Sequence, residues 1–75
     1  MKTMTCRDLG GACDLAFTGE RFEEIEAQSR AHGMDMFCAQ DPAHLQAMSA
    51  MRKLMENPEQ MAEWYEGKRR EFEAL

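Results

Sequence analysis

The stretch TCRDLGGACDL, residues 5–15, places Cys6 and Cys13 on either side of a pair of glycines. Glycine readily adopts positive φ, so this segment predicts a turn. Apolar and polar side chains alternate before and after it, which favours strands near 2–7 and 13–18. We therefore expect a short β-hairpin with both cysteines at its closed end.

A helix is expected directly after this hairpin. Thr18 is a candidate N-cap, acidic residues fill the following turn, and Gly33 is a typical stop, so residues 19–33 are predicted to be helical. Phe22 and His32 fall on the same face of that helix. Because this apolar face packs against the hairpin, His32 is expected to point toward the hairpin.

Two further helices are predicted in the C-terminal half. Asp41-Pro42 and Asn57-Pro58 each combine a good N-cap residue with proline at the first helical position. The second helix begins almost where the first ends, so residues 41–75 are expected to form a helical pair with a very short turn. The predicted fold class is therefore α+β and mostly helical.

The expected domain organisation follows from these elements. A chain of 75 residues is long enough for one domain, 1–75, with a thin core. Residues 1–37 are predicted to form a ββα unit, and 41–75 the helical pair. Residues 34–40 are predicted to be a linker between them.

The predicted lengths bring His32 to the two cysteines. A strand of about six residues spans about 20 Å, and a helix of about thirteen residues returns over the same distance. A helix that packs back on the hairpin therefore ends beside Cys6 and Cys13. This Cys2His cluster has the plan of a ββα zinc finger, although its spacing, C-x6-C-x18-H, differs from the zinc-finger spacing.

Zinc is the first candidate for such a cluster because it accepts thiolate and imidazole ligands in tetrahedral geometry. Iron and copper accept the same ligand types. The sequence offers four sources for a fourth ligand: Cys38 in the linker, His44 in the next helix, Asp8 in the hairpin loop, or water. We favour Cys38 and expect His44 to face solvent.

Other interpretations of the cysteines stay open at this point. A buried cysteine often serves as a small apolar side chain, and a histidine at a helix C-terminus is favourable there as a partial cation. A disulfide across the hairpin or redox-labile thiols are further alternatives. An enzyme is not expected, because no C-x-x-C motif or orienting third group accompanies the Cys–His pair.

Charge and hydropathy restrict the binding partners and the cellular compartment that we expect for this chain. The chain carries 14 acidic and 9 basic residues, and the acidic residues are spread along it. Because proteins hold nucleic acid through lysine and arginine contacts to phosphate, nucleic-acid binding is not expected. No apolar run is long enough for a membrane span or a signal peptide. We therefore expect no membrane association and a cytoplasmic protein, whose thiols stay reduced.

The C-terminal helices carry more large apolar side chains than a small ββα unit is expected to bury. The residues concerned are Trp64, Tyr65, Phe72 and Leu75. Surplus apolar surface on a thin-cored chain favours self-association, and two-fold dimers are the commonest oligomers. We therefore predict a homodimer through the C-terminal helices.

The N-terminal half resembles a known family. The matching elements are Cys6-Arg-Asp-Leu-Gly, Cys13-Asp14, Gly19-Glu20 and His32-Gly33-Met34. Over roughly residues 1–37 they resemble domain of unknown function 1059, a family of short bacterial and archaeal proteins. Some members carry the label small metal-binding protein, but no activity is implied. Many members have a second histidine five residues before the His-Gly pair, where this chain has Ala27.

The residues and the resemblance together predict a small metal-binding protein, with zinc as the expected ion. The alternative is a small helical module that binds itself or a protein partner and holds no metal.

Overall fold

The structure, a computed structural model, describes all 75 residues. A two-stranded antiparallel hairpin is followed by three helices, and one turn of 3-10 helix lies in the hairpin loop. The elements are β1 (Lys2–Thr5), η1 (Arg7–Leu9), β2 (Ala16–Gly19), α1 (Phe22–Ala39), α2 (Pro42–Met55) and α3 (Pro58–Glu73). The predicted α+β, mostly helical fold class is confirmed.

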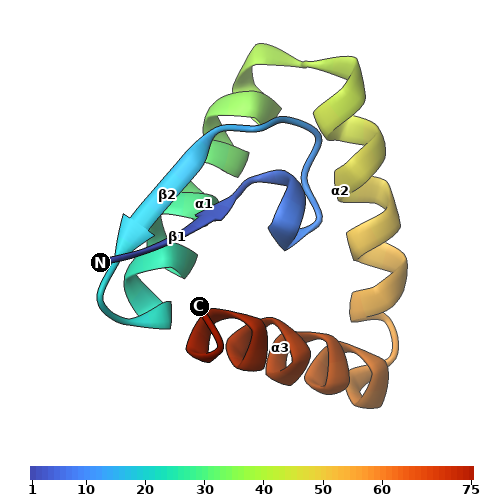
Figure 1. The fold of residues 1–75 in the computed structure, drawn as a ribbon. Coiled ribbons are helices and arrows are strands. Elements are labelled where there is room, and N and C mark those ends of the chain that lie inside the picture. Colours follow the sequence, from blue (N-terminus) through green and yellow to red (C-terminus); the bar gives the residue numbers. More distant parts are fainter.

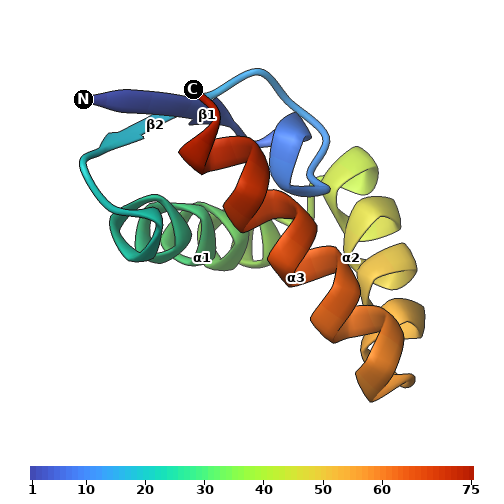
Figure 2. The same ribbon diagram turned by 60° about the horizontal axis from the view of Figure 1, so that its bottom comes forward.

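The elements form a flat molecule that measures 31 × 27 × 15 Å. The hairpin lies over α1, α2 leaves the far end of α1, and α3 returns toward β1 (Figures 1 and 2). The two chain ends meet, since Lys2 Nζ donates a hydrogen bond to the Glu73 carbonyl oxygen at 3.2 Å. None of the helices combines the length and the apolar character that crossing a membrane demands.

The hairpin is shorter than the sequence predicts. Cys6 has helical backbone angles, φ −52° and ψ −44°, and is the N-cap of η1, so β1 ends at Thr5. The strands predicted at 2–7 and 13–18 are therefore too long at the closed end, and both cysteines lie in the loop. Two hydrogen bonds still tie the loop together, from Cys6 N–H to the Leu15 carbonyl and from Arg7 N–H to the Cys13 carbonyl.

The prediction that the first helix ends at Gly33 is wrong. Helix α1 passes through Gly33 and continues to Ala39, so the predicted linker at 34–40 is almost entirely helical. Gly33 lies where α1 meets α2: a Cβ on it would be 4.0 Å from the Met48 Cε. The helix ends at Gln40, whose left-handed backbone, φ 56°, lets its N–H reach the carbonyls of the last turn.

The start of α1 also differs from the prediction. The helix begins at Phe22, and its N-cap is Arg21, which makes no side-chain capping bond; Thr18 lies in β2 instead. The predicted caps of the later helices are confirmed. Asp41 accepts a hydrogen bond from the His44 N–H at 3.0 Å, and Asn57 accepts bonds from the next turn of α3.

The core consists of a few side chains between the hairpin, α1 and α3. Its buried apolar residues are Met4, Cys6, Phe17, Phe22, Ile25 and Phe72. The Phe22 ring packs edge-on against Tyr65, with 5.4 Å between the ring centroids. It also packs at a tilt against Phe72, with 5.7 Å between the centroids. These contacts attach α3 to the ββα part of the chain.

This packing changes the dimer surface that the sequence suggests. Phe72 is 4% exposed and packs inside its own chain, so it cannot serve at an interface. Trp64 and Tyr65 are half-buried, whereas Leu75 is 63% exposed. Dimerisation through the C-terminal helices stays a prediction.

Candidate metal centre

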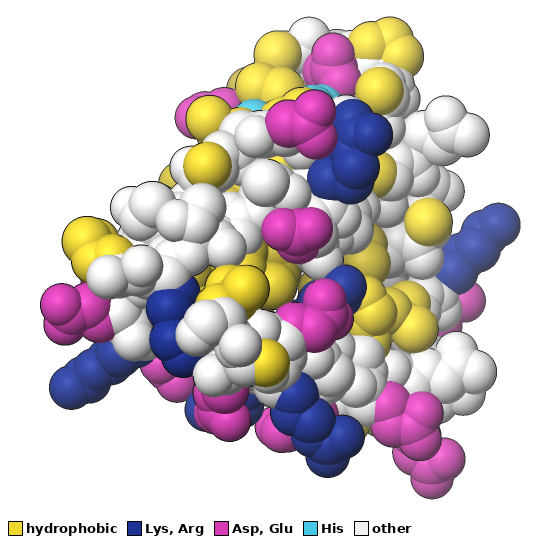
Figure 3. All heavy atoms as spheres, viewed as in Figure 1, with side chains coloured by type: hydrophobic (Ala, Val, Ile, Leu, Met, Phe, Trp, Pro, Cys, Tyr) yellow, Lys and Arg dark blue, Asp and Glu magenta, His cyan; other side chains and the backbone are white.

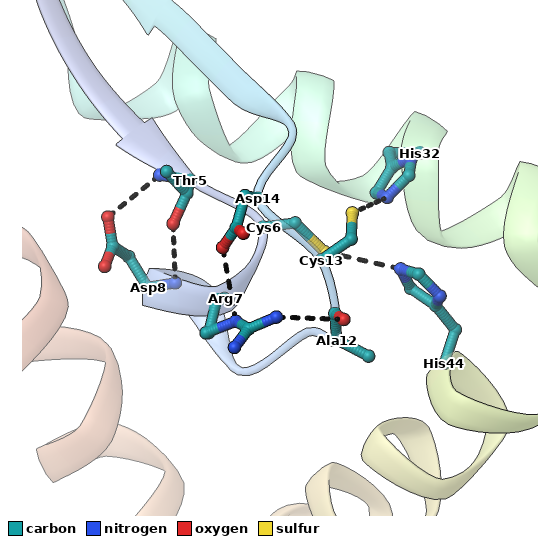
Figure 4. A network of polar contacts seen from close by, with 9 residues as sticks. All are labelled: Thr5, Cys6, Arg7, Asp8, Ala12, Cys13, Asp14, His32 and His44. Atoms are coloured by element: carbon teal, nitrogen blue, oxygen red, sulfur yellow. Dashed lines mark hydrogen bonds and ion pairs between the residues drawn. The ribbon is translucent and has the colours of Figure 1, made fainter.

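Four side chains from three segments meet at the closed end of the hairpin. Cys6 and Cys13 come from the loop, His32 from α1 and His44 from α2, and their donor atoms all lie within 4.8 Å of one another (Figure 4). The Cys13 Sγ is 3.3 Å from the His32 Nε2, and the Cys6 Sγ is 3.7 Å from the His44 Nε2. A tetrahedral zinc ion would separate such atoms by about 3.3–3.8 Å.

The sequence predicts Cys6, Cys13 and His32 in this cluster. Its favoured fourth ligand, Cys38, is wrong, because His44 holds that position. Cys38 is exposed near the C-terminal end of α1 and takes no part in the cluster. The reason is that α1 continues past Gly33, so no linker folds back to bring Cys38 inside. His44, expected to face solvent, is 7% exposed and completes the cluster.

Asp8, another candidate for the fourth position, has a structural partner instead. Its carboxylate accepts a hydrogen bond from the Thr5 N–H at 2.9 Å, and its own N–H donates to the Thr5 Oγ1 at 3.1 Å. The bond from the Thr5 N–H holds the pKa of Asp8 below its usual value. This reciprocal pair fixes the backbone on both sides of Cys6.

The double glycine has two separate roles at this site. Gly10 has φ 89°, a left-handed conformation that ends η1 and that residues with a side chain seldom adopt. Gly11 provides space, because a Cβ there would overlap the Cys6 Sγ. The two glycines thus let the loop fold tightly around the Cys6 thiol.

A pair of glycine substitutions tests this packing. We expect Gly11→Ala to displace the Cys6 thiol and to weaken metal binding at least about tenfold, since misplacing one ligand costs the chelate much of its stability. Gly67→Ala is the matched control: a Cβ there has nothing within 4 Å, and alanine favours the interior of α3. Isothermal titration with zinc measures the affinity of each variant. Equal affinities would show that Gly11 does not position the thiol.

Asp41 orients His44 toward the sulfurs. The carboxylate accepts a hydrogen bond from the His44 Nδ1 at 2.6 Å, in addition to capping α2. A carboxylate only accepts, so Nδ1 carries the proton, and in the neutral imidazole Nε2 then has a lone pair that faces the cluster. Metal-binding histidines commonly have such a carboxylate partner. The same bond raises the pKa of His44 and lowers the pKa of Asp41.

The two thiols have different surroundings. A hydrogen bond from the Leu15 N–H, helped by the nearby imidazoles, lowers the pKa of Cys13 to about 7. Burial raises the pKa of Cys6. Cys13 is therefore the thiol that supplies a thiolate near neutral pH, and thiolates are the form that binds metal.

His32 is held by aromatic packing. Its ring lies against Phe17 at 5.8 Å between centroids and meets the His44 ring edge-on at 5.2 Å. The site therefore combines two sulfur and two nitrogen donors with a carboxylate that orients one imidazole. Ala27 is exposed on α1.

The comparisons with known proteins agree with the sequence resemblance. Residues 1–36 match the model of the family described as protein of unknown function (DUF1059). That span includes Cys6, Cys13 and His32 but ends before His44. Neither the curated proteins nor the solved structures gave a match. Residues 1–36, which are just under half of the chain and hold three of the four clustered side chains, are therefore identified as a DUF1059 region.

Proposed function

We propose that this chain is a small metal-binding protein that holds one zinc ion through a Cys2His2 site. The ligands are Cys6, Cys13, His32 and His44. The observation that carries the proposal is the convergence of their four donor atoms within 4.8 Å. Two thiolates and two imidazoles are a donor set that zinc accepts in tetrahedral geometry, and four protein ligands are typical of structural rather than catalytic zinc.

The proposed ion stabilises the fold. It joins the hairpin loop to both α1 and α2, segments that are far apart in the sequence. Only eight of the 75 residues are buried, and chains with so little core often depend on a metal or another cross-link.

Metal content in matched cysteine variants tests the proposal. Protein purified under reducing conditions is expected to carry about one zinc per chain, measured by inductively coupled plasma mass spectrometry. Cys38→Ser, which changes a cysteine outside the cluster, should leave that value unchanged. Cys13→Ser and His44→Ala should both lose most of the metal. Zinc that persists in these two variants, or that disappears in Cys38→Ser, would place the site elsewhere.

The affinity for zinc is expected to fall as the pH falls. Zinc must displace protons from the ligands, and the raised pKa of His44 and the Cys13 pKa of about 7 make both groups compete for protons below neutrality. Between pH 7 and pH 6 we expect a loss of at least about tenfold, measured by competition with a chelating dye. An affinity that does not change over this interval would argue against thiolate ligands.

We also propose that the chain pairs with itself through its C-terminal helices. Leu75, which follows α3, is 63% exposed, and Trp64 of α3 is only half-buried, so both leave apolar surface uncovered. Light scattering is expected to give twice the chain mass of 8.6 kDa, and Leu75→Glu should restore the monomer. A wild-type monomer at micromolar concentration would rule this pairing out.

A further inference from the structure

A cleft of about 340 Å³ opens beside the proposed metal centre. Cys6, His32 and His44 form one part of its lining, and the methionines Met48, Met51 and Met55 form another. The volume lies within the range of small-molecule sites, which are mainly apolar with a few polar groups. The four ligands of the metal centre do not account for this space, because the methionines and Arg52 lie outside the cluster.

The cleft follows α2 away from the metal centre. His44, Met48, Met51 and Arg52 all line it and lie on successive turns of this helix. Eight residues separate His44 from Arg52, a distance of about 12 Å along the helix axis. Hydrophobic side chains gather where α2 meets the rest of the molecule (Figure 3). The cleft is therefore long, with an apolar wall.

Arg52 gives the cleft a positive charge away from the metal centre. Its side chain is exposed, and none of the ion pairs in the structure involves it. A guanidinium that lines an apolar cleft and lacks a carboxylate of its own chain is a matching group for an anion, since its planar fork accepts a carboxylate in a bidentate manner.

We propose that this cleft binds a small organic anion with an apolar chain, such as a medium-chain fatty acid. The carboxylate pairs with Arg52, and the chain lies along Met48 and Met51 toward the metal centre. Methionine side chains adapt their shape to apolar ligands of this kind. The anion makes no bond to the metal, so this site is additional to the proposed zinc-binding function.

Decanoate tests the proposal, in a titration of ¹⁵N-labelled protein that has been incubated with zinc, followed by NMR. We expect saturable shifts of amides that line the cleft, among them those of Gly10, Gly33 and Met51. Arg52→Gln should weaken decanoate binding at least about fivefold. Lys53→Gln, the matched control on the next residue of α2, should not weaken it, because Lys53 is exposed and does not line the cleft.

Two further ligands separate the parts of the proposal. 1-Decanol, which lacks the charge, should bind more weakly than decanoate and be insensitive to Arg52→Gln. Acetate, which lacks the chain, should not bind. Shifts scattered over the whole surface, or equal effects of Arg52→Gln and Lys53→Gln, would overturn the proposal. The zinc content of the same samples is also measured. If the protein holds zinc but does not bind decanoate, only this inference is rejected. If the protein binds decanoate but holds no zinc, only the proposed function is rejected.

Discussion

Removal of the proposed zinc ion is expected to lower the melting temperature by at least about 20 °C, because structural zinc contributes many kcal/mol and each kcal/mol shifts a domain of this size by about 4–8 °C. The effect should be greatest at α2. His44 is the only buried residue of this helix, so without the ion little apolar burial holds α2 against α1. Circular dichroism during heating, with and without a chelator, measures the change.

Restoring zinc to the chelated protein should recover the original melting curve. The Cys38→Ser variant should respond to chelation as the wild-type chain does, because Cys38 lies outside the cluster. An unchanged melting temperature after metal analysis has verified complete removal of zinc would mean that the ion does not support the fold.

The second large effect is expected from Phe72→Ala. Phe72 is the only buried residue of α3. Its ring contacts Phe22, and the Lys2 ammonium lies 4.9 Å from the centroid of the Phe72 ring. Replacing a buried phenylalanine with alanine costs about 3–5 kcal/mol. In a chain with so small a core, we expect α3 to detach from the hairpin and much of the stability to be lost.

Urea denaturation followed by the fluorescence of Trp64, the single tryptophan, measures this cost. Met34→Ala is the control, because it truncates a large apolar side chain of α1 that is 62% exposed and lies outside the proposed dimer surface. In the monomer the control should change the free energy of unfolding by less than about 0.5 kcal/mol. A loss of under about 1.5 kcal/mol in Phe72→Ala would show that α3 is held by other contacts.

The features that the sequence predicts well depend on local chemistry. Asp41 and Asn57 cap the helices that follow them, and the double glycine makes the hairpin turn. The meeting of Cys6, Cys13 and His32 follows from matched element lengths, even though the strand and helix bounds used in that argument are wrong. The error at the helix end lies beyond His32 and therefore does not move it.

The features that the sequence does not predict depend on contacts between helices. Gly33 looks like a helix stop, but the good helix formers Met34, Met36 and Ala39 follow it, and the small residue fits where α1 meets α2. Because α1 is longer than predicted, Cys38 lies away from the hairpin loop, and the start of α2 lies beside that loop. The spacing of Asp41 and His44 is the one local signal that indicates the fourth ligand, since an N-cap carboxylate can also orient a histidine three residues later.

X-ray absorption spectroscopy of the purified protein at the zinc edge tests the central claim most directly, because it identifies the atoms bound to the ion. The proposed site predicts two sulfur neighbours at about 2.3 Å and two nitrogen neighbours at about 2.0–2.1 Å. His44→Ala should remove a nitrogen neighbour or the ion itself. A first shell with three sulfur atoms, or with oxygen and nitrogen only, would contradict the Cys2His2 centre.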